Sequence, residues 1–201
     1  FWSERRDLEE RSILQLEHSR ALGAQGARIG VRGLMSRTRP GDVLESLDLE
    51  GREYELEVWV EHPVIRTRAL SLWVEAGLEA LSDRLEFRED DDVLSEDNLR
   101  VGYVGLRARR RDTLGYTEGS IRLRQGIEAF GASERGDEDL TRLDGDPAAL
   151  VIQGEIERSL VFGDGFELFG EAAGQYATDP LLAGEEFALG GTTFGRGYDP
   201  S

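Results

Sequence analysis

The sequence contains no cysteine, so it can form neither a disulfide framework nor a thiolate metal site. Histidine is scarce, and His18 and His62 lie too far apart in the sequence to suggest a zinc site. No apolar run approaches the roughly 20 residues that a membrane-spanning helix needs. The chain begins at Phe1 without a methionine or a recognisable signal peptide, so we expect it to be either processed or a piece of a longer protein.

The sequence also contains few basic residues relative to acidic ones. The 24 basic residues stand against 41 acidic ones, which gives a formal net charge of −17. This balance argues against nucleic-acid binding, which needs a basic footprint. Acidic runs at residues 90–92 and 136–139 invite a calcium interpretation, but they lack the ligand spacing and central glycine of an EF-hand loop. Solvated acidic loops explain these runs better, and we expect no metal and no cofactor.

No catalytic motif stands out in the sequence. Serine, histidine and aspartate do not combine into a nucleophile motif, and G-x-S-x-G is absent. Glutamate pairs such as Glu55 and Glu57 resemble the two carboxylates of a glycosidase. Because such pairs recur on several predicted strands, the charged lining of a sheet face explains them better. We therefore expect that the protein is not an enzyme.

Apolar and polar residues alternate with a period of two along most of the chain, which predicts β-strands. The clearest case is the run 54–61, where aromatic and aliphatic residues alternate with glutamate and tryptophan. Eight strands are predicted, over residues 11–18, 27–37, 54–61, 69–87, 98–109, 118–130, 149–162 and 166–177.

The length and spacing of these strands favour a membrane barrel. Soluble strands usually have about 5–6 residues, whereas a tilted membrane strand needs roughly 9–11. Short and long connections alternate, as in barrels with short periplasmic turns and longer extracellular loops. The five prolines all fall in predicted connections, as expected for residues that cannot donate to a strand ladder: Pro40, Pro63, Pro147, Pro180 and Pro200. The predicted fold class is therefore all-β, an antiparallel transmembrane β-barrel.

The strand face opposite the apolar stripe carries many charged residues. A wide barrel holds water, so charges inside it stay solvated, whereas a charge on the lipid side would cost up to about 2–4 kcal/mol. A soluble sheet with one wet face is the alternative. For the barrel, the residues predicted to face the lumen are Glu55, Glu57, Glu75, Glu79, Arg122, Arg124, Glu155 and Glu157.

The last fifteen residues, 187–201, are rich in glycine, and Arg196 stands between Gly195 and Gly197. Glycine permits positive φ and close backbone approach, at an entropic cost. This composition predicts a loop that folds back against other atoms and places Arg196 accurately. A solvated loop arginine is the plainer interpretation of the same residues.

Residues 187–191 read Phe-x-Leu-Gly-Gly and are followed by Arg196-Gly197-Tyr198. This pattern resembles the arginine–glycine–aromatic loop motif of the Omp85 superfamily, with Gly195 where valine is usual. From about residue 27 to 199 the sequence is similar to the outer-membrane transporters of two-partner secretion, the haemolysin-activator group of the ShlB, FhaC and HecB type. Residues 36–41 and 123–127 support the similarity.

The resemblance implies a sixteen-stranded barrel, of which this chain would supply about eight strands. Residues 1–201 would then form a partial translocator domain, without the periplasmic POTRA domains or the C-terminal strands. The motif loop, residues 178–201, would fold into the lumen and anchor to the inner wall. The residues implied in that anchor are Gly190, Gly191, Arg196, Gly197 and Tyr198.

The resemblance also implies a function and a location. It predicts a pore in the outer membrane of a Gram-negative bacterium, surrounded by lipid, that exports a large secreted partner of the filamentous-haemagglutinin or haemolysin kind. Assembly factors of the BamA and TamA type share the motif and are the first alternative. A soluble acidic β-protein that binds a ligand is the second.

Overall fold

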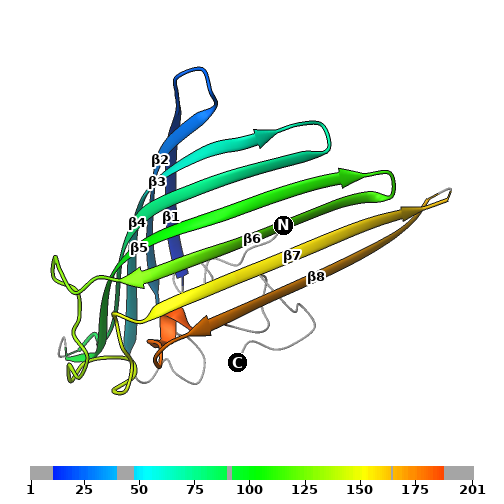
Figure 1. Cartoon of the computed structure of the whole chain (residues 1–201). Helices are drawn as coiled ribbons and strands as arrows, with labels where there is room; N and C mark the ends of the chain where they lie inside the picture. The colour runs from blue at the N-terminus through cyan, green and yellow to red at the C-terminus, as the bar shows by residue number, and fades with distance from the viewer. Residues whose placement is uncertain (1–10, 40–47, 90–91, 164, 188–201) are drawn as a thin grey trace.

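The computed structural model describes residues 11–39, 48–89, 92–163 and 165–187, which form one antiparallel sheet (Figure 1). Each strand pairs with the next along the chain, so the order in the sheet is β1 to β8. A short 3-10 helix follows the last strand. The elements are β1 (Arg11–Leu22), β2 (Ala27–Thr38), β3 (Leu49–Arg66), β4 (Leu70–Phe87), β5 (Val93–Asp112), β6 (Gly115–Gly126), β7 (Leu150–Phe162), β8 (Phe166–Ala177) and η2 (Ala183–Glu185).

The predicted all-β class and all eight predicted strands are confirmed, but several boundaries differ. Strands β3 and β5 are longer at both ends than their alternation predicts, because backbone pairing with β4 continues past the alternating segments. Strand β6 ends at Gly126 instead of continuing to Phe130. Phe130 has a φ of 56°, a left-handed conformation that cannot continue an extended strand.

The position predicted for Pro63 is wrong, because this residue lies within β3 and not in a connection. Pro63 pairs with Trp73 of β4, and the register then shifts between Pro63 and Ile65. Such a bulge tolerates proline because the ladder is already interrupted there. After the bulge Arg66 pairs with Ser71, so Arg66 shares the side of the sheet that Trp73 faces.

The two ends of the sheet differ in their connections. At one end, called here the short-turn end, the connections are residues 23–26, 67–69, 113–114 and 163–165. At the other, the long-loop end, they are residues 39–48, 88–92 and 127–149. Figure 1 shows the short turns along the top and right of the view and the loop of residues 127–149 at the lower left. This asymmetry is the one typical of outer-membrane barrels.

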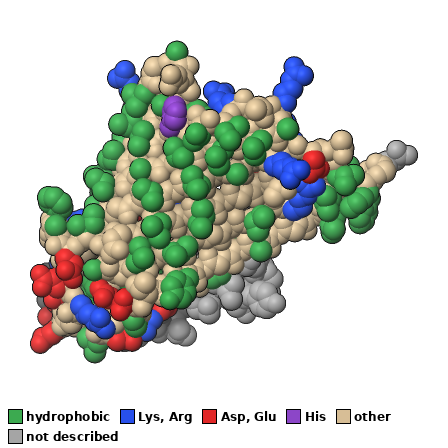
Figure 2. Space-filling model, in the orientation of Figure 1, with side chains coloured by type: hydrophobic (Ala, Val, Ile, Leu, Met, Phe, Trp, Pro, Cys, Tyr) green, Lys and Arg blue, Asp and Glu red, His purple; other side chains and the backbone are tan. Residues whose placement is uncertain are grey.

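The convex face of the sheet exposes large aliphatic side chains. Leu16 is 67% exposed, Leu78 63% and Ile156 53%. Figure 2 shows this face, with hydrophobic side chains spread over the strands and charged ones mainly toward their ends. Extensive exposed apolar surface marks a site of contact with another apolar phase or partner. Among the described residues, no helix is long and apolar enough to cross a membrane.

The buried core is small and lies at the long-loop end. One cluster combines Leu99 and Val101 of β5 with Leu140 and Leu182 from the connections. A second combines Ala149 and Val151 with Leu181. Both clusters form where residues beyond β8 fold back onto the concave side of the sheet. The segment that follows the last strand is therefore part of the packed structure.

The sheet curls around a cavity on its concave side. Every strand from β1 to β8 contributes at least one residue to the cavity lining. Within the described residues β1 and β8 do not pair with each other, so the sheet remains open. The result is a curved wall with an aliphatic outside and a hollow inside.

Candidate functional site

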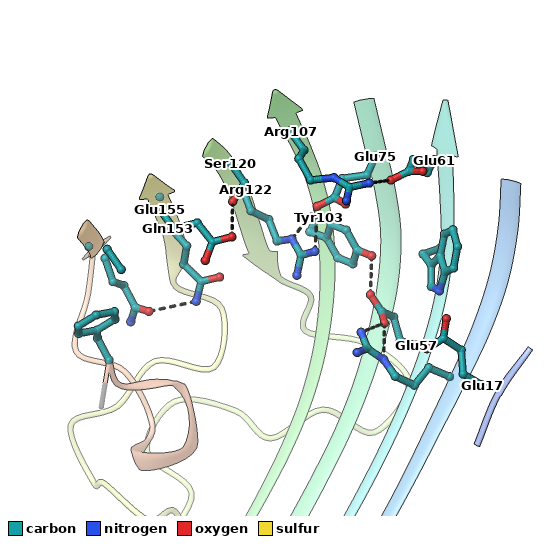
Figure 3. Close-up of a pocket in the computed structure, with 17 residues that line it drawn as sticks. Glu17, Glu57, Glu61, Glu75, Tyr103, Arg107, Ser120, Arg122, Gln153 and Glu155 are labelled. Atoms are coloured by element: carbon teal, nitrogen blue, oxygen red, sulfur yellow. Dashed lines mark hydrogen bonds and ion pairs between the residues drawn. The ribbon is translucent and has the colours of Figure 1, made fainter. Parts of the chain in front are cut away.

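The cavity on the concave face has a volume of about 530 Å³ and a polar, charged lining. Figure 3 shows side chains from successive strands converging on it. Because side chains alternate between the two faces of a strand, the residues between the aliphatic ones all point inward. The charged and polar side chains that line it include Glu17, Arg32, Glu57, Glu61, Glu75, Tyr103, Arg107, Ser120, Arg122, Gln153, Glu155 and Gln175.

Glu57 is held at the middle of β3 by two partners. Its side chain is only 2% exposed. Arg32, directly opposite on β2, donates from Nε to Oε2 at 3.0 Å. Tyr103 of β5 donates its hydroxyl to Oε1 at 2.5 Å. A buried carboxylate without such partners would be strongly unfavourable, so these contacts make the position of Glu57 possible.

Tyr103 reaches Glu57 across β4 because the residue facing it there is glycine. Gly77 pairs with Tyr103 in the β4–β5 ladder. A Cβ atom at Gly77 would lie 2.5 Å from Tyr103 Cζ, closer than any real contact. The same relation links Gly30 to Trp59, where a Cβ would come within 2.4 Å of the indole. Glycine thus lets large inward side chains lie flat along the wall.

Arg122 of β6 connects two neighbouring parts of the wall. Its Nη2 lies 2.8 Å from Glu75 Oε1 on β4. Its guanidinium carbon also lies 4.4 Å from the centre of the Tyr103 ring, within the range of a cation–π contact. Ion pairs, hydrogen bonds and ring contacts therefore join side chains from β2 to β6 in one network.

Arg124, two residues further along β6, joins the wall to the segment beyond β8. It pairs with Glu79 of β4 at 2.7 Å and with Glu185 of η2 at 2.9 Å. The Glu185 side chain is only 6% exposed. Burial raises the pKa of the Glu185 carboxyl, although the Arg124 guanidinium opposes that shift. Gln175 adds a hydrogen bond from Nε2 to the Glu185 carbonyl oxygen at 2.8 Å.

Apolar and backbone contacts complete the docking of residues 178–187, called here the docked segment. Leu182 is fully buried against Leu99, Val101 and Leu140. The amide of Asp146 donates to the Pro180 carbonyl at 2.8 Å. Phe187, at the end of the segment, lines the cavity. The chain therefore leaves β8, packs against the inner wall and arrives at the cavity.

Comparison with known proteins identifies the family. Residues 36–201 match the family described as haemolysin secretion/activation protein ShlB/FhaC/HecB. The chain belongs to this ShlB/FhaC/HecB family, as the sequence predicted. Among solved structures, CdiB from Escherichia coli matches with a TM-score of 0.77 and 17% identity, over 92% of this chain and 35% of CdiB. A search of curated proteins found none that matches.

The chain spans 35% of the length of CdiB, and at 17% identity the similarity shows a shared fold. It confirms the predicted all-β, antiparallel fold class: the eight described strands form one open sheet that resembles part of CdiB. Membership of the ShlB/FhaC/HecB family places the chain among secretion and activation proteins, not among enzyme families.

The structure brings most of the predicted lumen-facing residues together. Glu57, Glu75, Arg122 and Glu155 line the main cavity. Glu79 and Arg124 reach the same network through ion pairs, and Glu157 lines a smaller recess that Glu155 also lines. Glu55 is half-buried on β3, two residues before Glu57. The predicted anchor residues lie outside the described residues: Gly190, Gly191, Arg196, Gly197 and Tyr198.

The sequence did not single out Tyr103, Arg107 or Glu185. A signal existed for the first two, since Val104 and Leu106 alternate with Tyr103 and Arg107. No sequence periodicity marks Glu185, because η2 is a single short turn. The role of Glu185 comes from its ion pair with Arg124 of β6, which the sequence alone does not reveal.

Proposed function

We propose that the complete protein is an outer-membrane pore that exports a large secreted partner polypeptide in two-partner secretion. In this proposal residues 1–201 are part of the barrel wall and of its motif loop. The observation that carries it is the curled sheet, which has an aliphatic convex face and a charged cavity lined by all eight strands. The aliphatic convex face is compatible with lipid, and the charged cavity is compatible with water.

The inner wall suits the passage of a polypeptide. An extended chain exposes backbone amides and carbonyls, which need polar partners or water when they leave bulk solvent. Several carboxylates and guanidiniums of the wall are already paired with one another, as Arg32 is with Glu57 and Arg122 with Glu75. Such a lining stays hydrated without binding any single charged group very tightly. The barrel would therefore conduct a chain without chemical catalysis.

The motif loop would continue from the docked segment into the interior. The Arg124–Glu185 ion pair and the buried Leu182 hold the base of this loop on the inner wall. From Phe187 at the cavity, the chain would carry Gly190, Gly191, Arg196, Gly197 and Tyr198 inward. There Arg196 would anchor the loop through charge-assisted hydrogen bonds, which a guanidinium can make in pairs to one carboxylate.

The orientation of the pore follows from its connections. Outer-membrane barrels have short turns toward the periplasm and long loops outside. The short-turn end would therefore receive the partner, and the long-loop end, near the docked segment, would release it. The partner would be a protein of the filamentous-haemagglutinin or haemolysin kind.

Export by the full-length protein tests this proposal. The partner would be co-expressed with wild-type transporter, with Arg196→Lys and with Arg196→Ala, and secreted partner measured in the medium. Lysine keeps the charge but loses paired hydrogen bonding. We expect wild type to export, Arg196→Lys to export less, and Arg196→Ala to lose at least about tenfold, which corresponds to about 1.4 kcal/mol.

Matched levels of each transporter in the outer membrane are the control. Normal export by Arg196→Ala would contradict the anchoring role. If wild type exported nothing and its deletion instead depleted other barrel proteins from the membrane, an assembly factor would replace the exporter.

A further inference from the structure

Arginine accumulates at the short-turn end of the sheet, against the acidic character of the whole chain. The first three hairpin ends, residues 20–28, 61–73 and 107–118, contain eight arginines and three acidic residues, an excess of five positive charges. The whole chain has a formal net charge of −17. The positive charge of this rim is therefore concentrated at the first three of its four short turns.

The three acidic residues of these hairpin ends are already paired. Glu61 binds Arg107, Glu118 binds Arg109 and Asp112 binds Arg158. Four arginines with exposed side chains form no ion pair with any described residue: Arg66, Arg68, Arg110 and Arg111. Elsewhere in the wall, arginines such as Arg32, Arg122 and Arg124 do have carboxylate partners. The rim guanidiniums are thus available to an external anion.

Several of these arginines surround one recess. Arg66, Arg68, Arg109 and Arg111 line a hollow of about 510 Å³ together with Trp73. We name it the arginine recess. Arg107, whose guanidinium carbon lies 4.9 Å from the centre of the Trp73 ring, also lines the main cavity. The arginine recess therefore lies beside the entrance to the cavity, on the same face of the sheet.

The face on which the free arginines lie indicates the kind of partner. Arg111 follows Arg107 and Arg109 at two-residue spacing along β5, and Arg66 is turned to the concave side by the bulge at Pro63. Arg20 and Arg110 instead lie on the convex face, because they pair with the aliphatic residues Ile29 and Leu70. Lipid headgroups would meet the convex side, whereas a chain entering the cavity would meet the arginine recess.

We propose that the arginine recess captures acidic segments of an extended polypeptide as they enter the interior from the short-turn end. This proposal rests on the proposed export function. Guanidinium groups bind carboxylates through paired, charge-assisted hydrogen bonds. At an exposed rim each such pair is weak and is screened by salt. Capture would therefore be reversible, as the onward movement of a chain requires.

Peptide binding by the full-length protein in lipid nanodiscs tests the proposal. The probe is a fluorescent peptide of glutamate and serine, compared with a peptide of equal length in which glutamine replaces glutamate. We expect the acidic peptide to bind and the neutral one not to bind. The affinity should fall steeply between about 0.1 M and about 1 M salt, as the Debye length shortens.

A double variant locates the binding site. Arg66→Gln with Arg111→Gln removes two concave guanidiniums that form no ion pair with described residues, and we expect the acidic peptide to bind about fivefold more weakly. Arg20→Gln with Arg110→Gln removes the same charge from the convex side and should leave binding unchanged. Equal binding of both peptides would overturn the proposal. A loss confined to the convex variant would also overturn it, because the peptide would then bind on the convex side and not in the arginine recess.

Conductance in planar bilayers separates the two proposals. If the protein conducts but binds both peptides equally, the pore proposal stands and the proposed role of the arginine recess fails. A protein that binds the acidic peptide at the arginine recess but neither conducts nor exports would contradict the export function, while the capture of acidic segments would stand.

Discussion

At the scale of single residues, the inner wall depends on pairs in which one strand supplies a large side chain and its neighbour supplies glycine. Gly77 and Tyr103 form the best example, because the tyrosine crosses β4 to bond Glu57. The interaction needs all three positions. A change at the glycine should therefore affect a carboxylate that it does not touch.

Gly77→Ala should destabilise the full-length barrel by about 1–3 kcal/mol, the usual cost of forcing extra atoms into a packed site. The new methyl would lie 2.5 Å from Tyr103 Cζ and would displace the ring from Glu57. Urea unfolding in detergent, followed by tryptophan fluorescence, measures the effect. Gly33→Ala on β2 is the matched control, since a Cβ there would meet only the Glu55 carbonyl oxygen, at an ordinary contact distance of 3.8 Å. Equal stability of the two variants would contradict this account.

At the scale of elements, the docked segment explains departures from strand alternation. Leu99 and Val101 share the concave side of β5 with Tyr103, yet they are apolar because Leu182 covers them. In the same way, Leu181 covers Val151 of β7. Sequence periodicity predicts the strands well, since each strand face meets a uniform environment. It could not predict the docked segment, which replaces water over one part of the concave face.

Leu182→Ala should loosen the docked segment. Removing a fully buried leucine from contact with Leu99, Val101 and Leu140 should cost about 2–5 kcal/mol. Faster hydrogen exchange in residues 178–187 of the full-length protein would report the loss, with the strands unaffected. Leu168→Ala, at a position 51% exposed on β8, is the control. Unchanged exchange in the Leu182 variant would show that the segment is held by other contacts.

Docking should also depend on pH through Glu185. Burial raises the pKa of this carboxyl above its ordinary value of 4.5, so the docked state binds the proton more tightly than the released state does. Docking should therefore strengthen as the pH falls through the raised pKa, with the gain complete below 4.5. Hydrogen-exchange protection of residues 178–187, corrected for intrinsic rates, should be higher at about pH 5 than at about pH 8.

Glu185→Gln should abolish this pH dependence, because glutamine does not titrate. If acidification instead released the segment in the wild-type protein, the Arg124–Glu185 ion pair would outweigh the burial of the carboxyl.

At the scale of the whole molecule, the two faces and the two ends have separate roles. The convex face is aliphatic and the concave face is charged. The short-turn end carries several arginines that form no ion pair with described residues, and the long-loop end carries the docked segment. The edges at β1 and β8 are unpaired within the described residues. Unpaired strand edges are unfavourable in lipid, so the proposed pore requires these edges to pair with further strands.

The central claim is that the concave face meets water and the convex face meets lipid in the assembled protein. Residues 1–201 contain no cysteine, so an introduced cysteine is the single thiol within them; any cysteine elsewhere in the full-length protein would first be replaced by serine. Ser120 and Ile121 are neighbours on β6: Ser120 lines the cavity, and Ile121 is 51% exposed on the opposite face. A membrane-impermeant maleimide should label Ser120→Cys but not Ile121→Cys in membranes containing the full-length protein. Labelling of Ile121→Cys alone, or equal labelling of both, would contradict the account.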